Sequence, residues 1–188
     1  MFPINFPTLD TQRLRLRALD ADDADAVFGI FSHPEVMRYW STAAMTDIAA
    51  AQELIGRASA AFAERAAIRW AIVPREGGQV LGTCSLFAFS AQNRRAELGY
   101  VLGRTHWGHG YIHEALVAVV DYAFGVLDLH RLETDIDPRN EASVRTAARL
   151  GFVREGHLRE RWIVGDEISD SLIMGLLRSA WQGAGENR

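Results

Sequence analysis

The sequence predicts an α/β domain with a mostly antiparallel sheet and one parallel pair of strands, and three observations support this class. Hydrophobic residues alternate with a period of two along residues 96–103 and then recur at helical spacing along residues 112–127. The turn pairs Gly77-Gly78 and Gly165-Asp166 each separate two strand-like runs, which indicates hairpins. A further alternating run, residues 132–137, follows the long helical pattern, and a helix between neighbouring strands makes them parallel.

Composition places the chain among ordinary globular proteins. It has 188 residues, 48% hydrophobic and 23% charged, which is enough for one domain with a substantial core. A formal net charge of -4 argues against a protein that grips nucleic acid through its phosphates. No apolar run is long enough to span a bilayer, and the first residues do not resemble a signal peptide. We therefore expect a single domain over residues 1–188, with a loose tail from about Gln182 and neither nucleic acid nor a membrane as partner.

The single cysteine, Cys84, lies in an apolar strand-like run. One thiol cannot form an internal disulfide, so we expect a buried side chain in a protein of the reducing cytoplasm. A thiol buried in a core strand is also a poor nucleophile.

The N-terminal part predicts one strand followed by two helices. Apolar residues and arginines alternate along residues 14–18, as on a strand with one polar face. Asp20 can cap a helix over residues 24–31, and Pro34 ends it. Thr46 offers a cap for a second helix over residues 48–62.

An aromatic pair, Tyr39 and Trp40, lies in the predicted loop between these helices. Loops often carry binding residues, so one interpretation makes the pair a wall of a substrate cleft. The other interpretation is that both rings fold back onto the core. The sequence leaves both open.

The remaining elements complete the predicted sheet. Residues 69–73 and 80–89 form the first hairpin, and the strand over residues 96–103 follows as the next antiparallel neighbour. Asn140 starts a last helix that stops at Gly151. The closing hairpin is predicted over residues 152–177.

The glycine-rich turn after residue 103 predicts an anion site. The first amides of a helix lack internal partners and lie at its positive end, so phosphate oxygens suit them. Gly108 and Gly110 have no Cβ and would let an anion approach the backbone. The Gly-Lys-Ser/Thr ending of a P-loop is absent, and His113 stands where the dinucleotide fingerprint needs a third glycine. A nucleoside triphosphatase and a Rossmann dinucleotide domain are therefore disfavoured, and a bare turn without ligand is the alternative.

Four motifs follow one another along the chain: Glu97-Leu-Gly-Tyr-Val-Leu102, Trp107-Gly-His-Gly-Tyr-Ile-His-Glu-Ala115, Pro138-Arg-Asn140-Glu-Ala-Ser143 and Leu150-Gly-Phe152-Val-Arg-Glu-Gly156. Together they resemble the GNAT superfamily of acyl-CoA-dependent N-acetyltransferases, and within it the RimJ/RimL branch fits best. The resemblance covers nearly the whole chain. Several ordered motifs at family spacing are far more specific than one glycine loop.

The resemblance implies a fold and a cosubstrate. The fold is a splayed, mostly antiparallel seven-stranded sheet with two central parallel strands and flanking helices, and acetyl-CoA inserts where those two strands diverge. It implies that the backbone of Tyr100, Val101 and Leu102 pairs with the pantetheine arm, and that Asn140 and Ser143 contact the cofactor. It implies that the pyrophosphate lies on the amides of the turn: Trp107, Gly108, His109, Gly110, Tyr111, Ile112 and His113.

Acetyl transfer to an amine needs a base for the amine and an acid for the leaving thiolate. Many members of the superfamily use a tyrosine as the acid, but this chain has Ala147 at the matching position. In the RimJ/RimL branch the serine at the position of Ser143 is a candidate for this work. The alternative for Ser143 is a hydroxyl that satisfies a backbone amide in the first turn of the helix.

Glu97 resembles the strand glutamate that serves as base in several branches. Burial in a cleft could raise its pKa towards the working range. Alternatively, it is an ordinary solvated carboxylate near Arg94 or Arg95. The rival carboxylates are Glu133, Glu155 and Asp170.

His109 and His113 lie four residues apart at the start of a helix, hence on one face, which raises the question of a metal site. Glu114 does not complete a His-Glu-x-x-His motif. We therefore expect no metal, with both imidazoles at the rim of an anion site.

The resemblance thus implies an N-acetyltransferase that moves an acetyl group from acetyl-CoA to a primary amine by direct attack. The acceptors it implies are a protein N-terminal amine, as on a ribosomal protein, or a small amine such as a polyamine, an amino acid or an antibiotic. A non-catalytic acyl-CoA-binding module is the alternative, because the tyrosine is missing. Acyl-chain length and quaternary state stay open, a homodimer included.

Overall fold

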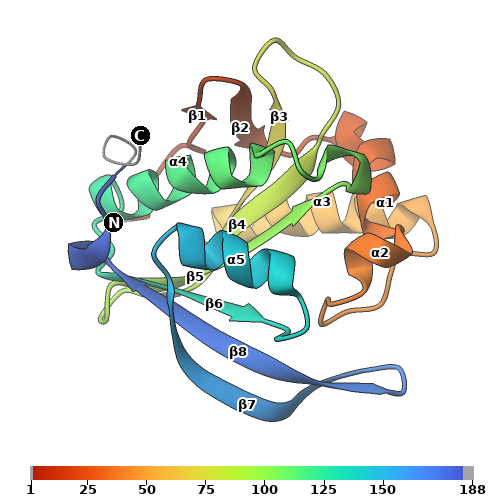
Figure 1. Ribbon diagram of the computed structural model, residues 1–188. Helices are drawn as coiled ribbons and strands as arrows, with labels where there is room; N and C mark the ends of the chain where they lie inside the picture. The colour runs from red at the N-terminus through yellow and green to blue at the C-terminus, as the bar shows by residue number, and fades with distance from the viewer. Residues whose placement is uncertain (1, 184–188) are drawn as a thin grey trace.

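The structure is a computed structural model and describes residues 2–183 (Figure 1). Its centre is one eight-stranded sheet in the order β1-β2-β3-β4-β5-β6-β8-β7, in which only β5 and β6 are parallel neighbours. The strands are β1 (Leu9–Asp10), β2 (Leu14–Ala18), β3 (Ile68–Pro74), β4 (Gly82–Ser90), β5 (Arg95–Leu102), β6 (Arg131–Ile136), β7 (Val153–Val164) and β8 (Glu167–Leu177).

Helices cover both faces of this sheet (Figure 1). One face carries α4 (Tyr111–Gly125) and α5 (Glu141–Arg149), and the other carries α1 (Ala24–Phe31), α2 (Pro34–Met37) and α3 (Ile48–Ala63). Alternation along β3 explains both layers. Trp70 and Ile72 are buried in the core with α4, whereas Ala71 and Val73 are buried in the core with α1 and α3. A strand that is apolar on both faces belongs in the middle of a three-layer domain.

The parallel pair of β5 and β6 separates part-way along its length. The register joins only three pairs, Arg95 with Arg131, Ala96 with Leu132 and Glu97 with Glu133. β5 continues beyond this point to Leu102, and α5 begins beside the opening. There the side-chain oxygen of Asn140 accepts the amide of Ser143 at 3.1 Å and caps the helix. The splayed strands and this capped helix end position the site described below.

The predicted splayed α/β sheet with its central parallel pair is confirmed, and some details differ from the prediction. The sheet has eight strands instead of seven, because the short strand β1 pairs with β2. Part of the predicted aromatic loop is helical, since Pro34 is the first residue of α2, a position that proline favours. Asp47 caps α3 instead of Thr46: its carboxylate accepts the amide of Ala50 at 3.0 Å.

Two further expectations concern burial and the chain end. Cys84 is fully buried in the core that contains α4, as predicted. No helix in the described part of the chain is long and apolar enough to cross a membrane. The expected loose tail lies outside the described residues from residue 184 onward.

Candidate active site

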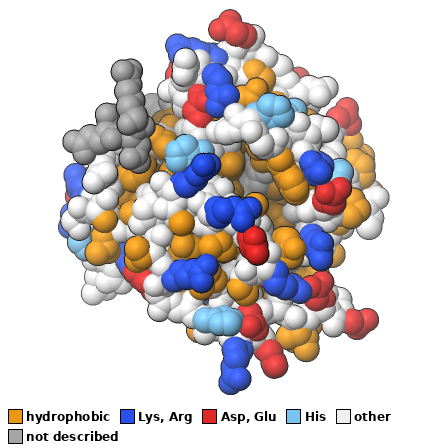
Figure 2. Space-filling model, in the orientation of Figure 1, with side chains coloured by type: hydrophobic (Ala, Val, Ile, Leu, Met, Phe, Trp, Pro, Cys, Tyr) orange, Lys and Arg blue, Asp and Glu red, His pale blue; other side chains and the backbone are white. Residues whose placement is uncertain are grey.

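A groove of about 460 Å³ runs along β5 beside the first turns of α4 and α5. Arginine side chains gather around the hollowed middle of this face (Figure 2). The groove brings together most of the predicted cofactor residues: Tyr100, Val101, Leu102, Trp107, Gly108, Gly110, Tyr111, Ile112, Asn140 and Ser143. His109 and His113 do not line it. The His113 side chain lines a separate small cavity together with Trp181.

The backbone of the turn before α4 is open to a ligand. Gly108 and Gly110 have positive φ angles of 80° and 76°, which glycine adopts without strain. Within residues 2–183, no hydrogen bond engages the amides from Gly108 to His113, and the first helical bond runs from the Glu114 amide to the Gly110 carbonyl at 3.1 Å. Successive unpaired amides at the positive end of a helix are suited to phosphate.

Arg13 of the segment before β2 holds this turn in place. Its guanidinium donates to the His109 carbonyl at 3.0 Å and to the Glu114 carboxylate at 2.6 Å. Thr11 also donates to Glu114, at 2.6 Å. Burial alone would raise the pKa of Glu114, but the hydrogen bonds from Thr11 and Arg13 outweigh it and lower that pKa. The turn is therefore anchored through its carbonyl and its first helical carboxylate, which leaves its amides free.

The edge of β5 that faces the gap can be assigned from the ladder with β4. In an antiparallel pair, successive residues bond alternately towards the two neighbouring strands. Gly103 donates to the Leu81 carbonyl at 2.8 Å, so Val101, two residues earlier, also bonds towards β4. A Cβ built on Gly82 would lie 2.2 Å from the Val101 carbonyl oxygen, which confirms its direction.

Tyr100 therefore directs its amide and carbonyl into the gap, and Val101 does not. Val101 was expected to pair with the pantetheine arm, but its backbone belongs to the β4 ladder and its side chain is buried in the core with α1 and α3. The Leu102 carbonyl accepts the Trp107 indole N–H at 2.8 Å. This leaves the Leu102 amide and both backbone groups of Tyr100 for an added strand.

Tyr100 and Ser143 meet where the groove joins a second cavity. The Tyr100 hydroxyl lies 2.7 Å from the Ser143 Oγ and also donates to the Ser143 carbonyl at 3.1 Å. Burial, opposed by the hydrogen bond with Ser143, raises the pKa of Tyr100 to about 12. The Ser143 hydroxyl does not cap the helix, because Asn140 does so. The Tyr100 hydroxyl is thus protonated at neutral pH and can donate.

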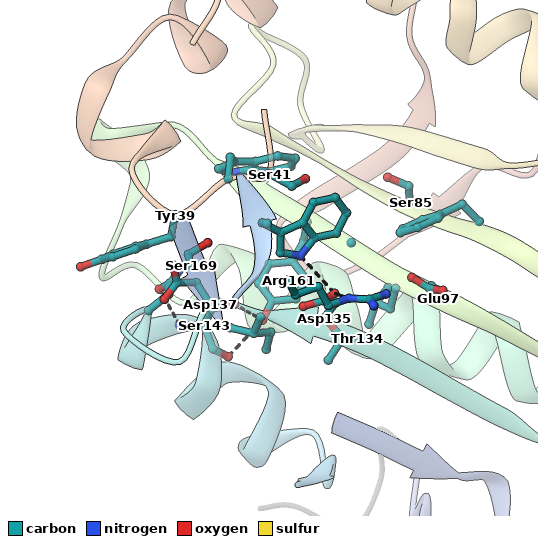
Figure 3. Close-up of a pocket in the computed structure, with 18 of the residues that line it drawn as sticks. Tyr39, Ser41, Ser85, Glu97, Thr134, Asp135, Asp137, Ser143, Arg161 and Ser169 are labelled. Carbon is teal, nitrogen blue, oxygen red and sulfur yellow. Dashed lines mark hydrogen bonds and ion pairs between the residues drawn. The ribbon is translucent and has the colours of Figure 1, made fainter. Parts of the chain in front are cut away.

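The second cavity, of about 490 Å³, extends across β4, β5 and β6 (Figure 3). It shares five lining residues with the groove: Tyr39, Trp40, Tyr100, Asn140 and Ser143. Tyr39 and Trp40 therefore form a wall of both, and their role as the wall of a substrate cleft stays a prediction. Trp40 also packs edge-on against Phe31, with ring centroids 5.5 Å apart. Its ring therefore also contacts the core, which was the alternative interpretation.

Glu97 points into this second cavity (Figure 3). Its carboxylate has no hydrogen bond or ion pair with any described residue. Burial raises its pKa, and the negative charges of Glu133 and Asp135 raise it further. A carboxylate with a raised pKa and no partner is suited to accept a proton.

The rival carboxylates all have hydrogen-bonding partners. Glu133 pairs with Arg95 at 2.6 Å and with Arg131 at 2.8 Å. Glu155 pairs with Arg131, and the hydrogen bond lowers its pKa. Asp170 accepts the Glu160 amide and pairs with His157 at 2.8 Å, and both contacts lower its pKa. These three side chains do not line the cavity.

The described residues contain no cluster of three or more His, Cys, Asp or Glu side chains that could hold a metal ion. His109 stacks on Tyr111, with ring centroids 5.7 Å apart, while His113 faces the separate cavity. The Cys84 thiol lies in the core with α4, and burial raises its pKa. It is therefore not a nucleophile for acyl transfer.

Sequence reasoning missed several polar residues of the second cavity. Asp135 accepts from Arg161 at 3.3 Å and from the Trp162 indole at 3.4 Å, and all three line the cavity (Figure 3). Arg69 of β3 also lines it. The alternation along β6 had already placed Asp135 on a polar face, but only the strand order brings β3 and the closing hairpin to that face.

Comparison with known proteins agrees with this geometry. A family model described as an acetyltransferase (GNAT) domain matches residues 13–153. An uncharacterized N-acetyltransferase, p20 of Bacillus licheniformis, is 36% identical over 176 residues, which cover 94% of this chain and 99% of that protein. A spermidine N(1)-acetyltransferase of Vibrio cholerae is 25% identical over 174 residues, which cover 93% of this chain and 98% of that protein.

Solved structures repeat the fold. A protein provisionally described as a ribosomal-protein-serine acetyltransferase from Vibrio cholerae superimposes with a TM-score of 0.79 at 25% identity, covering 94% of this chain and 99% of that one. The family model spans the turn, the gap between β5 and β6 and the capped start of α5. The chain is therefore a member of the GNAT family of acetyltransferases, in its RimJ/RimL-like branch.

Proposed function

We propose that this acyltransferase moves an acetyl group from acetyl-CoA to a primary amine that attacks the thioester directly. The observation that carries the proposal is the junction at Tyr100 and Ser143, where a groove with free backbone amides meets a cavity with an unpaired carboxylate. The groove suits the donor and the cavity suits the acceptor. A thioester carbonyl led along β5 would reach the amine at this junction.

The residues of the groove would hold acetyl-CoA in three places. The amides from Gly108 to His113 would bind the pyrophosphate, as the unpaired turn suggests. The backbone of Tyr100 and the Leu102 amide would pair with the pantetheine arm. Asn140 lies beside this path and is already engaged as the cap of α5, so its contact with the arm would use its amide nitrogen.

The reaction balances with the groups present. Glu97 takes a proton from the ammonium of the acceptor, and the nitrogen lone pair then attacks the carbonyl carbon. The new C–N bond forms, the C–S bond breaks, and the thiolate of CoA receives a proton from the Tyr100 hydroxyl. The second proton of the nitrogen returns to Tyr100 through the Ser143 hydroxyl, which accepts one proton as it passes its own across their 2.7 Å contact. This pair would do the work of the tyrosine that is absent at Ala147.

Two acceptor classes are consistent with the comparisons. A protein N-terminal amine is our first candidate, because a ribosomal-protein-serine acetyltransferase shares the fold. A small amine is the second candidate, because a spermidine acetyltransferase is similar over nearly the whole chain.

The direct test is release of free thiol from acetyl-CoA in the presence of peptide N-termini, amino acids and polyamines. Acetylation of at least one acceptor, confirmed by mass, is expected. The chain contains no lysine, so its own side chains add no amine background. If acetyl-CoA raises the melting temperature while thiol release stays at background with every acceptor, the chain is a binding module and the proposal is wrong.

A further inference from the structure

Two guanidinium groups line the acceptor cavity, and only one of them has an acid partner. Arg161 is bonded to Asp135 at 3.3 Å. The Arg69 guanidinium makes no hydrogen bond, ion pair or aromatic contact with any residue in the described part of the chain. It is partly buried, and burial together with the charge of Arg57 lowers its pKa. An arginine stays charged in such a place, so its desolvation is uncompensated until an anion arrives.

Strand register places Arg69 on the same face of the sheet as the proposed base, Glu97, two strands away. Arg69 is paired with Ser85 across β3 and β4, and Ser85 is paired with Gly99 across β4 and β5. Paired residues share a face, and Glu97 lies two residues from Gly99 on that same face. Two strand spacings and two residues put the Cα atoms of Arg69 and Glu97 about 12 Å apart. Both residues line the same cavity, so one acceptor molecule could contact the two charged groups.

The other charges of the cavity are already neutralised. Asp135 is paired with Arg161, and Asp137 is paired with Arg139 at 2.6 Å. Among the described residues that line the cavity, the charged groups without a hydrogen bond or ion pair are thus the Glu97 carboxylate and the Arg69 guanidinium. A polyamine would bring a second ammonium towards Arg69 and meet repulsion. A dipolar molecule would satisfy both groups at once.

We infer that Arg69 binds a carboxylate of the acceptor, so that the preferred substrate is a primary amine that also carries a carboxylate. Arginine is suited to this because its planar fork can hold a carboxylate by two parallel hydrogen bonds. Two sources present this chemistry: the α-carboxylate of a free amino acid, and an acidic side chain in the first residues of a peptide. The inference rests on the proposed acetyl transfer and assigns its acceptor class.

The experiment compares acceptors that differ only in this charge. One arm uses serine and serinamide, and the other uses peptides that begin Ser-Glu and Ser-Gln, all with saturating acetyl-CoA. We expect kcat/KM to be at least about tenfold higher for the carboxylate member of one arm, since such a hydrogen-bonded charge pair is worth roughly that factor or more. The arm that shows the difference identifies the source.

Variants then assign the preference to Arg69. In Arg69→Gln the ratio of kcat/KM between the carboxylate acceptor and its neutral counterpart should fall to near one, through a higher KM for the carboxylate acceptor. Arg69→Lys should keep part of this preference, because lysine retains the charge without the planar fork of arginine. Arg15→Gln is the matched control: Arg15 is an exposed arginine of β2 paired with Asp10 and lines none of the cavities described, so the ratio should not change.

The outcomes separate this inference from the proposed function. Equal kcat/KM for charged and neutral members of both pairs in the unaltered protein would overturn the inference, as would a ratio that survives Arg69→Gln. Thiol release would continue in either case, so acetyl transfer would stand. The shift in melting temperature with acetyl-CoA checks that each variant is folded. If Arg69→Gln does not fold, the comparison of charged and neutral acceptors in the unaltered protein still tests the inference.

Discussion

The Tyr100 hydroxyl lies 2.7 Å from the Ser143 Oγ although the two residues are 43 positions apart in the chain. One comes from the splayed edge of β5, the other from the first turn of α5, and Asn140 fixes the second by accepting its amide. The contact places two hydroxyl groups at the junction of the groove along β5 and the second cavity. The predictions below follow from this junction and from the glycines around it.

Removing the Tyr100 hydroxyl should slow the chemical step. For Tyr100→Phe we expect kcat to fall about 10- to 100-fold, because a positioned acid contributes at least that much. Ser143→Ala should cost less, since the tyrosine remains. If the two hydroxyls act as one relay, the double variant should be no slower than Tyr100→Phe. Rates from steady-state thiol release test this, and an unchanged kcat in Tyr100→Phe would return the tyrosine to a structural role.

Glu97→Gln should remove the acidic limb of the pH–rate profile. The base acts in its deprotonated form, so kcat/KM of the unaltered protein should rise with pH through the raised pKa of Glu97. Glutamine cannot titrate, so the variant should be slow and lack this rise, while its affinity for acetyl-CoA stays close to normal. Profiles from pH 5 to 9 decide the question. A variant with the same limb would exclude Glu97 as base.

Glu97→Gln should slow turnover but raise the stability of the folded protein at alkaline pH. The folded-state pKa of Glu97 lies above its ordinary value of 4.5, so the residue favours folding only at low pH and loses this contribution as pH rises through the folded-state pKa. Glu97→Gln should therefore melt at a higher temperature than the unaltered protein at pH 8. Near pH 4 the two melting temperatures should coincide. Thermal unfolding monitored by circular dichroism at both pH values checks the sign.

Gly110→Asp should abolish binding of acetyl-CoA by placing a carboxylate against the pyrophosphate. The matched control is Gly110→Asn, which has nearly the same shape, tolerates the positive φ of 76° and carries no charge. We expect the aspartate variant to bind more than about tenfold more weakly than the asparagine variant, since one repelled charge costs at least that factor. Calorimetric titration measures both. Equal affinities of the two variants for acetyl-CoA would show that the turn does not bind the pyrophosphate.

Two glycine-to-alanine changes should shift stability in opposite directions. At Gly82 a Cβ would lie 2.2 Å from the Val101 carbonyl oxygen, so alanine forces β4 and β5 apart and should cost about 3 kcal/mol. Gly29 is exposed in α1, and an added Cβ would have nothing within 4 Å, so alanine should stabilise by about 0.5–1 kcal/mol. Urea unfolding of both variants provides the comparison.

Local features of the site could be read from the sequence because neighbouring residues create them. Gly108 and Gly110 permit the turn, helical periodicity begins right after it, and Asn140 stands where α5 needs a cap. The caps show the limit of such reasoning. Thr46 and Asp47 are both good capping residues, and only the backbone geometry decides in favour of Asp47.

Residues that depend on pairing between distant strands were harder to predict. Val101 stood in the expected cofactor motif, yet the alternation of ladder bonds assigns its backbone to β4 and leaves Tyr100 facing the gap. Glu97 was the candidate base, and Glu133 on the neighbouring strand was one of its rivals. Arg95 and Arg131 form ion pairs with Glu133, whereas the Glu97 carboxylate has no hydrogen bond or ion pair with any described residue.

The amino-acid sequence by itself determined the class of the sheet, the glycine turn with its free amides and the family of acetyltransferases, because each depends on short-range periodicity or on residues close together in the chain. Only the tertiary structure decided that the Tyr100 hydroxyl meets Ser143, that Glu97 is the unpaired carboxylate and that Arg69 faces the same cavity without a partner. Hydrogen bonds and ion pairs between distant strands follow from register and packing, and those are properties of the folded sheet as a whole.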